Sequence, residues 1–116
     1  MHVVLAPDSF SGLLPAGQVA AALAEGWHAW APHDRLSLVP LSDGGPGFVD
    51  VLAGSLGGQV VATVVEDPLA RPAPATVLVV ERAGRRTAYV ESAQACGLHL
   101  LAGDEHDPAG TSSFGV

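Results

Sequence analysis

Two aspartates each follow a short apolar run and lie in a turn of small residues. Asp8 follows the run at residues 2–6, and Asp43 follows the run at residues 35–41. If both runs are parallel strands, Asp8 and Asp43 leave the sheet at the same edge, which is where open α/β sheets bind ligands. A pair of carboxylates there suits a metal ion or a hydroxyl group better than it suits packing.

Asp8 and Ser9 lie between a predicted strand and a predicted helix. In that place Asp8 could bind Mg²⁺, orient a hydroxyl group or accept its proton, and Ser9 could contact a ligand. The competing interpretation is an aspartate that makes an ordinary hydrogen bond within a turn.

Gly44 and Gly45 follow Asp43, and the pattern then becomes helical. Glycines let a backbone come close to a phosphate or a carboxylate, and the N-terminus of a helix favours an anion. The competing interpretation is a loop whose glycines only provide positive φ angles. The spacing is neither a Walker A motif nor a dinucleotide-binding fingerprint.

Two further groups of polar residues lie nearer the C-terminus. Glu91 and Ser92 end the last predicted strand, where they could contact a substrate or a metal, or where the acid could cap a helix. The hydroxyl cluster at residues 111–113 could hold an anion or form a plain N-cap.

The remaining reactive side chains indicate structure rather than chemistry. The five histidines share no metal-binding spacing, and residues 104–107 are typical of a solvated acidic loop. We expect Trp27 and Trp30 in the core and Cys96 as a small buried residue.

The first half of the chain predicts alternating strands and helices. Strands are expected at residues 2–6 and 35–41, and helices at residues 15–30 and 47–55. The longer helix has an apolar stripe made of Val19, Leu23, Trp27 and Trp30. This βαβα order predicts an α/β fold, the start of a doubly wound parallel sheet.

The second half is rich in valine and predicts a different arrangement. Three more strands are expected, at residues 59–66, 75–82 and 86–91. A turn at residues 83–85 favours an antiparallel hairpin, and the proline-rich residues 67–74 are expected to form a loop. We therefore expect a partial Rossmann-like lobe at residues 1–57 and a β-rich, partial second α/β lobe at residues 58–116.

Composition excludes several classes of function. The 116 residues carry a net charge of −7 with no lysine, which argues against binding to nucleic acid. No apolar run approaches the roughly 20 residues that span a bilayer, and the N-terminus lacks the pattern of a signal peptide. The single cysteine, Cys96, excludes an internal disulfide and favours the cytoplasm.

Four segments resemble, in the same order, motifs of the bacterial glycerate kinases. They are APDSFSG at residues 6–12, PLSDGGPG at 40–47, VESAQACGL at 90–98 and TSSFGV at 111–116. The family counterparts are APDSFKGS, PxADGGEGT, IEMAAASGL and TTSYGVGELI. The resemblance covers the chain from end to end, and it implies the N-terminal portion of a longer protein, truncated within the fourth motif.

The resemblance implies a phosphotransferase of organic acid metabolism. The γ-phosphoryl group of ATP would pass to a hydroxyl of glycerate, with Mg²⁺ bridging the phosphates. Asp8 and Asp43 would share the roles of metal ligand and catalytic residue, in an order left open. The residues implied to contact the substrate are Ser9, Gly44, Gly45, Glu91 and Ser92.

Two positions depart from the family pattern. Ser11 stands where the family has lysine, and Pro46 stands where it has glutamate, which removes a carboxylate and a backbone N–H group. The missing C-terminal portion could be a separate chain that partners this one. The alternative is a noncatalytic remnant or an interaction module.

Overall fold

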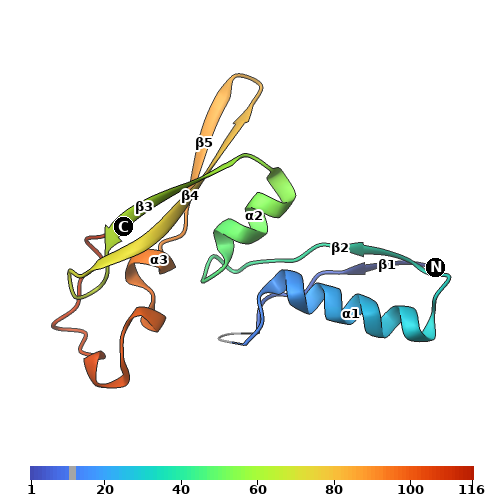
Figure 1. Ribbon diagram of the computed structural model, residues 1–116, viewed down its shortest axis with the longest axis horizontal. Helices are drawn as coiled ribbons and strands as arrows, with labels where there is room; N and C mark the ends of the chain where they lie inside the picture. The colour runs from blue at the N-terminus through green and yellow to red at the C-terminus, as the bar shows by residue number, and fades with distance from the viewer. Residues whose placement is uncertain (11–12) are drawn as a thin grey trace. The chain divides into compact units, whose positions relative to one another are not determined.

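The computed structural model describes residues 1–10 and 13–116, so Ser11 lies outside the described residues. The described chain forms two compact units, Met1–Asp43 and Gly44–Val116. The first holds a pair of parallel strands, and the second holds an antiparallel sheet of three strands (Figure 1). The predicted mixed α/β class is confirmed.

The first unit is a βαβ element. Strand β1 (His2–Leu5) pairs in parallel with β2 (Arg35–Leu38), and helix α1 (Ala16–Trp30) connects them. Parallel strands need such a crossover because a tight turn can join only antiparallel strands. Figure 1 shows α1 running alongside the strand pair. The predicted strand–helix–strand order is confirmed.

Only the N-terminal half of α1 is buried. Val19 is 3% exposed, whereas Leu23 is 47% and Trp30 is 92% exposed. The strands have four residues and the helix has 15. Strands of that length extend about 13 Å and the helix about 22 Å, so the sheet cannot cover the last turns of the helix. The prediction that Trp27 and Trp30 belong to the core is wrong, because both side chains are exposed.

Asp34 ties the opposite end of the first unit together. Its Oδ1 accepts a hydrogen bond from the amino group of Met1 at 2.7 Å, and its Oδ2 accepts one from Trp27 Nε1 at 3.1 Å. These two hydrogen bonds lower the pKa of Asp34. One carboxylate therefore joins the start of β1, the end of α1 and the approach to β2.

The second unit packs two helices against a three-stranded sheet. Its elements are α2 (Phe48–Leu56), β3 (Gln59–Glu66), β4 (Pro72–Arg82), β5 (Arg85–Val90) and α3 (Ala93–Cys96), followed by the short 3₁₀ turns η1 (Leu98–Leu100) and η2 (Gly103–Glu105). The strand order is β3-β4-β5, with antiparallel pairing throughout. Val49 of α2 packs with Leu78 and Val80 of β4, and Leu78 is fully buried.

Strand β4 begins earlier than the sequence predicted. Pro72 and Pro74, assigned to a loop, pair with Glu66 and Val64 of β3. Proline has no N–H group to donate, so a proline fits a strand where its nitrogen faces away from the partner strand. Thr76 shows which side that is, because its N–H group points away from β3 and donates to the Gln94 side chain. Because strand residues alternate, the two prolines place their nitrogens on that same side, so pairing with β3 is kept.

The boundary between the two units lies earlier than the predicted boundary between lobes. The compact units divide after Asp43, whereas the lobes were expected to divide after residue 57. The difference is α2, whose Phe48 and Leu52 pack against the buried residues of β4. The division of the family fold into lobes stays a prediction.

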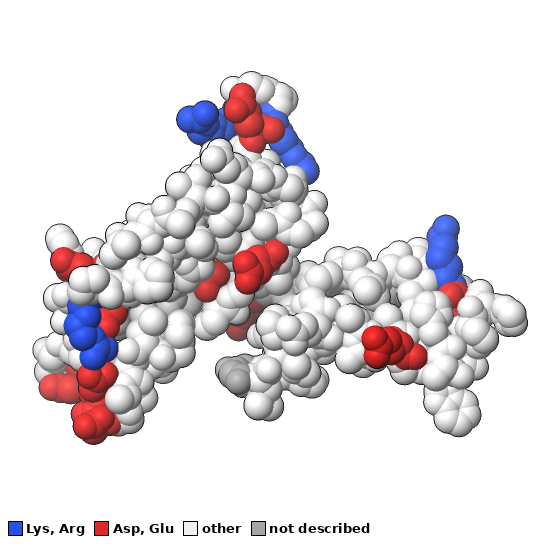
Figure 2. Space-filling model, in the orientation of Figure 1, with Lys and Arg blue, Asp and Glu red and all other residues white. Residues whose placement is uncertain are grey.

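The sheet of the second unit leaves apolar side chains in contact with solvent. In β3, Val60 is 49%, Val61 is 41% and Val64 is 70% exposed. Figure 2 shows uncharged surface along this sheet and charged side chains gathered at the turn end of β4 and β5. The sheet is therefore covered on only part of its surface by the described residues.

The turn between β4 and β5 provides a test of the fold. Ala83 (φ 49°) and Gly84 (φ 74°) both adopt positive φ, as a two-residue type I′ turn requires. Alanine is disfavoured there and asparagine is tolerated. We expect Ala83→Asn to raise the free energy of unfolding by about 0.5–1 kcal/mol, measured by urea denaturation. The control Ala88→Asn, in the middle of β5, should lower it, and a loss of stability in Ala83→Asn would contradict the assigned turn.

Candidate functional site

Asp8 and Asp43 leave the same end of the parallel strand pair. Backbone pairing continues past the strands, because Leu41 N–H donates to the Pro7 carbonyl oxygen at 2.9 Å. Asp8 follows Pro7 directly, and Asp43 lies two residues after Leu41. Both aspartates are exposed. The prediction that the two residues emerge at one sheet edge is confirmed.

The backbone around Asp8 orients its carboxylate. Ser9 N–H donates to Asp8 Oδ1 at 2.6 Å, which is the turn hydrogen bond that the sequence offered as one interpretation. A hydrogen bond to one oxygen fixes the carboxylate without burying it, and Asp8 stays exposed while Ser9 is half-buried. Asp8 is thus a pre-oriented carboxylate in contact with solvent.

Glycines shape the loop that follows Asp43. Gly44 has φ 94° and Gly47 has φ 95°, values that side chains other than glycine rarely tolerate. The Gly45 carbonyl oxygen accepts a hydrogen bond from Phe48 N–H at 3.2 Å, which closes the turn into α2. Positive φ accounts for Gly44, and both interpretations of the glycines stay open.

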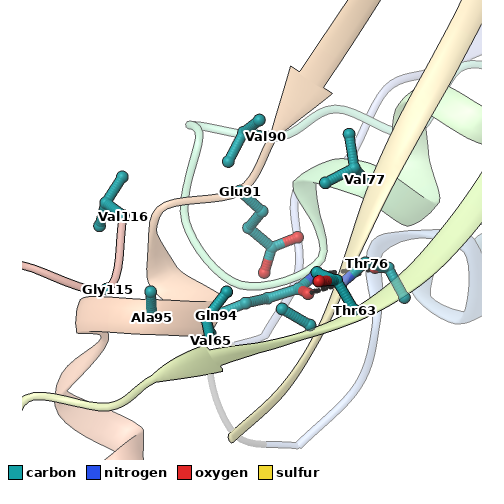
Figure 3. A pocket seen from close by; sticks show the side chains of 11 residues that line it. Thr63, Val65, Thr76, Val77, Val90, Glu91, Gln94, Ala95, Gly115 and Val116 are labelled. Carbon is teal, nitrogen blue, oxygen red and sulfur yellow. Dashed lines mark hydrogen bonds between the residues drawn. The ribbon is translucent and has the colours of Figure 1, made fainter. Parts of the chain in front are cut away.

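Glu91 lies just beyond β5 with its carboxylate buried. The residue is 5% exposed, and its Oε1 and Oε2 accept hydrogen bonds from Gly47 N–H at 3.1 Å and Val49 N–H at 3.0 Å. Figure 3 shows this side chain directed toward the segment that leads into α2. Of the two interpretations of Glu91, the geometry matches an acid that caps a helix.

Ser92 starts the short helix α3. Its carbonyl oxygen accepts a hydrogen bond from Cys96 N–H at 2.8 Å, and its side chain makes no cap hydrogen bond within the described chain. The contact with substrate predicted for Ser92 stays a prediction.

A small cavity lies between α3, β3 and β4. Its volume is about 180 Å³, and its polar lining includes Thr63, Thr76, Glu91 and Gln94, where Thr76 and Gln94 are hydrogen-bonded to each other (Figure 3). Asp8 and Asp43 do not line this cavity. The predicted site residues therefore fall into a group in the first unit and a group in the second.

Potential metal ligands do not gather into a cluster of three in the described part of the chain. Residues 1–10 and 13–116 contain no cluster of three or more His, Cys, Asp or Glu side chains suited to an ion. Within the same residues, no helix has the length and apolar character needed to cross a bilayer.

A network that the sequence analysis missed fastens the C-terminal segment. Arg71 Nε donates to Asp67 Oδ2 at 2.6 Å, and Arg71 Nη1 donates to Glu105 Oε1 at 2.7 Å. Arg71 Nη2 also donates to the Leu100 carbonyl oxygen at 3.1 Å. An acid and an arginine four residues apart across a proline turn are the signal that could have indicated the first contact.

Hydrogen bonding sets the charge state of this network. Burial raises the pKa of Asp67, but hydrogen bonds from Arg71 and from Leu69 N–H outweigh it, so the pKa is lowered. Hydrogen bonds from Ala102 N–H and from Arg71 lower the pKa of Glu105. Both carboxylates are therefore stabilised in their charged forms.

The hydroxyl cluster at residues 111–113 lies beside the same turn. Ser112 N–H donates to the Pro68 carbonyl oxygen at 2.9 Å, and Ser112 Oγ accepts a hydrogen bond from Phe114 N–H at 3.1 Å. In this structure the cluster anchors the chain by local and backbone contacts.

Comparison with known proteins establishes the family to which this chain belongs. The profile of the Glycerate kinase family matches residues 3–116. The chain belongs to the glycerate kinase family. The resemblance seen in its four motifs is confirmed.

Individual relatives agree with the family assignment. The chain is 35% identical over 114 residues to glycerate kinase of Halalkalibacterium halodurans, covering 98% of this chain and 30% of that protein. It is 33% identical over 116 residues to glycerate 2-kinase of Escherichia coli K12, covering 100% of this chain and 30% of that protein. The chain thus spans about 30% of the length of these relatives.

A solved structure shows the same fold. The crystal structure of a Salmonella typhimurium LT2 protein assigned as a glycerate kinase 2 superposes with a TM-score of 0.72 at 33% identity. The match covers 99% of this chain and 30% of that one. Both units of this glycerate kinase family member therefore have counterparts in a family structure.

The Asp67–Arg71–Glu105 network predicts a loss of stability in acid. Because the folded-state pKa values of Asp67 and Glu105 are lowered, their contribution is complete above the ordinary carboxyl range near pH 4. It is lost as the pH falls through the lowered values. We expect the thermal midpoint of Asp67→Asn to lie below that of the natural chain at pH 7, with the gap narrowing toward about pH 3. Circular dichroism measures this, and a gap of constant size would contradict it.

The exposed Asp104 supplies the matched control for this prediction. Asp104→Asn removes a carboxylate from the same C-terminal segment without touching Arg71. Its thermal midpoint should follow that of the natural chain at every pH.

Proposed function

We propose that this chain supplies part of a glycerate kinase, which transfers the γ-phosphoryl group of ATP to a hydroxyl of glycerate. The observation that carries the proposal is the emergence of Asp8 and Asp43 at one end of the parallel β1–β2 pair. Phosphoryl transfer depends on positioning and on charge neutralisation more than on covalent chemistry. Two carboxylates that leave one sheet edge suit that requirement.

The donor set at this edge fits Mg²⁺. Magnesium prefers oxygen ligands and usually binds through one or two carboxylates, keeping its other positions for water and substrate phosphates. Asp8 and Asp43 supply two exposed carboxylates of that kind. When bound, Mg²⁺ would neutralise charge on the ATP phosphates. One aspartate would hold the ion, and the other would orient the hydroxyl of glycerate or accept its proton.

Small and polar residues beside the aspartates would complete the contacts with substrate. Ser9 follows Asp8 directly, and Gly44 and Gly45 follow Asp43 directly. Their backbone and hydroxyl groups are the kind that bind carboxylate and phosphate oxygens. Ser92, exposed at the end of β5, is a further candidate.

The rest of a glycerate kinase chain is the proposed partner of this one. Parallel sheets are normally covered on both faces, yet Val4 of β1 and Leu38 of β2 are 56% and 46% exposed. The relatives are more than three times as long as the region matched here. We propose that the remaining part of the family fold, in the same polypeptide or in a separate chain, covers these faces.

A noncatalytic remnant or interaction module is the second candidate. The observation that favours it is Pro46, directly before the N-cap of α2, where it cannot donate a backbone hydrogen bond. A kinase of this family has a glutamate there by resemblance, so Pro46 alters the loop that carries Asp43.

The purified 116-residue chain should show no glycerate-dependent release of ADP, because a catalytic site needs its surrounding groups held in place.

A hybrid in which this chain replaces the matched segment of Halalkalibacterium halodurans glycerate kinase should release ADP in a coupled assay. In the hybrid, Asp8→Asn and Asp43→Asn should each lower kcat about a hundredfold. The control Asp104→Asn should leave kcat unchanged.

Three outcomes would count against the proposal. Robust activity of the chain alone would refute its dependence on a partner. Full activity of the hybrid carrying Asp8→Asn or Asp43→Asn would remove those residues from the site. A folded hybrid without activity would favour the noncatalytic remnant.

A further inference from the structure

The start of α2 lacks the groups that normally satisfy a helix N-terminus. Its N-cap is Gly47, which has no side chain, and the residue before it is Pro46, which has no N–H group. The first N–H groups of a helix have no partner within the helix, and together with the helix dipole they attract an anion. A ligand or a side chain must therefore supply the acceptors.

Glu91 supplies them from another part of the chain. Its two carboxylate oxygens accept hydrogen bonds from Gly47 N–H at 3.1 Å and from Val49 N–H at 3.0 Å. Phe48 N–H, between those two, donates to the Gly45 carbonyl oxygen at 3.2 Å. The N–H groups of these three consecutive residues are thus engaged inside the protein, and the anion at this helix end is Glu91 itself.

The cap is held rigidly on both sides. Glu91 is 5% exposed at the end of β5, and Val49 is 1% exposed within the core of α2 and β4. A buried carboxylate without partners is strongly disfavoured, so the side chain and the helix end stabilise each other. The residues of the second unit that precede α2, Gly44 to Pro46, end at this point.

We propose that Glu91 is a positioning residue that occupies the anion site of α2 and fixes the end of the loop carrying Gly44 and Gly45, within the second unit. This assigns Glu91 a role different from the contact with substrate that the family resemblance implied. A phosphate or carboxylate of a ligand can then bind to the loop itself but not to the end of α2. The role concerns the loop in the proposed function, but it rests on hydrogen bonds within the second unit.

Chemical rescue provides the test. Glu91→Ala removes the carboxylate and leaves a space beside the existing cavity of about 180 Å³. Hydrogen exchange of the Gly47 and Val49 amides, followed by NMR, should become roughly tenfold faster or more, since hydrogen bonds to a charged acceptor contribute about that factor. Sodium formate should restore the slow exchange in a saturable way, whereas sodium chloride at equal ionic strength should not.

Two further variants keep the test decisive. Glu91→Gln retains the shape and one acceptor oxygen, so exchange at Gly47 and Val49 should be intermediate, and this variant serves if Glu91→Ala does not fold. Glu81→Ala removes an exposed carboxylate from β4 and should leave both amides unchanged.

Two results would overturn the assignment. Exchange at Gly47 and Val49 that matches the Glu81→Ala control in both Glu91 variants would show that the carboxylate does not hold the helix end. Faster exchange that formate does not reverse would mean that Glu91 acts only by filling space. The experiment contains neither ATP nor glycerate, so its outcome is independent of whether the chain takes part in phosphoryl transfer.

Discussion

The parallel pairing of β1 with β2 determines the organisation of the first unit. Parallel strands force a crossover helix, and they also send the residues after both strands to the same edge. At the opposite end of the strand pair, Asp34 accepts hydrogen bonds from the amino group of Met1 and from the indole N–H of Trp27. At one end of the unit, hydrogen bonds to Asp34 hold the strands and the helix together. At the other end, Asp8 and Asp43 are exposed to solvent.

Burial separates the acids that maintain the structure from those that face outward. Glu91 and Asp67 are 5% and 7% exposed, and each accepts two or more hydrogen bonds from the protein. Asp8 and Asp43 are exposed and follow the ends of strands. The same side-chain chemistry thus serves helix capping at Glu91 and loop anchoring at Asp67, and a proposed ligand site at Asp8 and Asp43.

Much of the fold could be predicted because the signals are local. Apolar runs, the helical pattern at residues 15–30 and the turn expected at residues 83–85 predicted strands, a helix and a hairpin close to those observed. The first residues of β4 were missed because prolines usually indicate a loop. Pro72 and Pro74 are compatible with strand pairing only because their nitrogens lie on the side of β4 that faces away from β3. The exposure of Trp30 was missed because an apolar stripe predicts a buried face without revealing how far the sheet beneath it extends.

The candidate site was predictable to a smaller extent. The shared edge of Asp8 and Asp43 follows from strand order, which the sequence contains. The hydrogen-bond partners of Glu91 could not be predicted in this way, because Gly47 and Val49 lie more than 40 residues away in the sequence. Every residue except proline has a backbone N–H group, so the sequence does not indicate which of them Glu91 binds. Ser11 lies outside the described residues, so its departure from the family pattern gains no structural account.

The exposed valines of β3 have a consequence for the behaviour of the chain in solution. β3 is an outer strand of its sheet, eight residues long, without proline, glycine or lysine, and its sequence QVVATVVE has high β-propensity. Natural edge strands usually avoid this combination, because a regular edge with few charges can add a strand from a second molecule. As long as nothing covers β3, self-association through this edge competes with the folded monomer, and it grows with protein concentration.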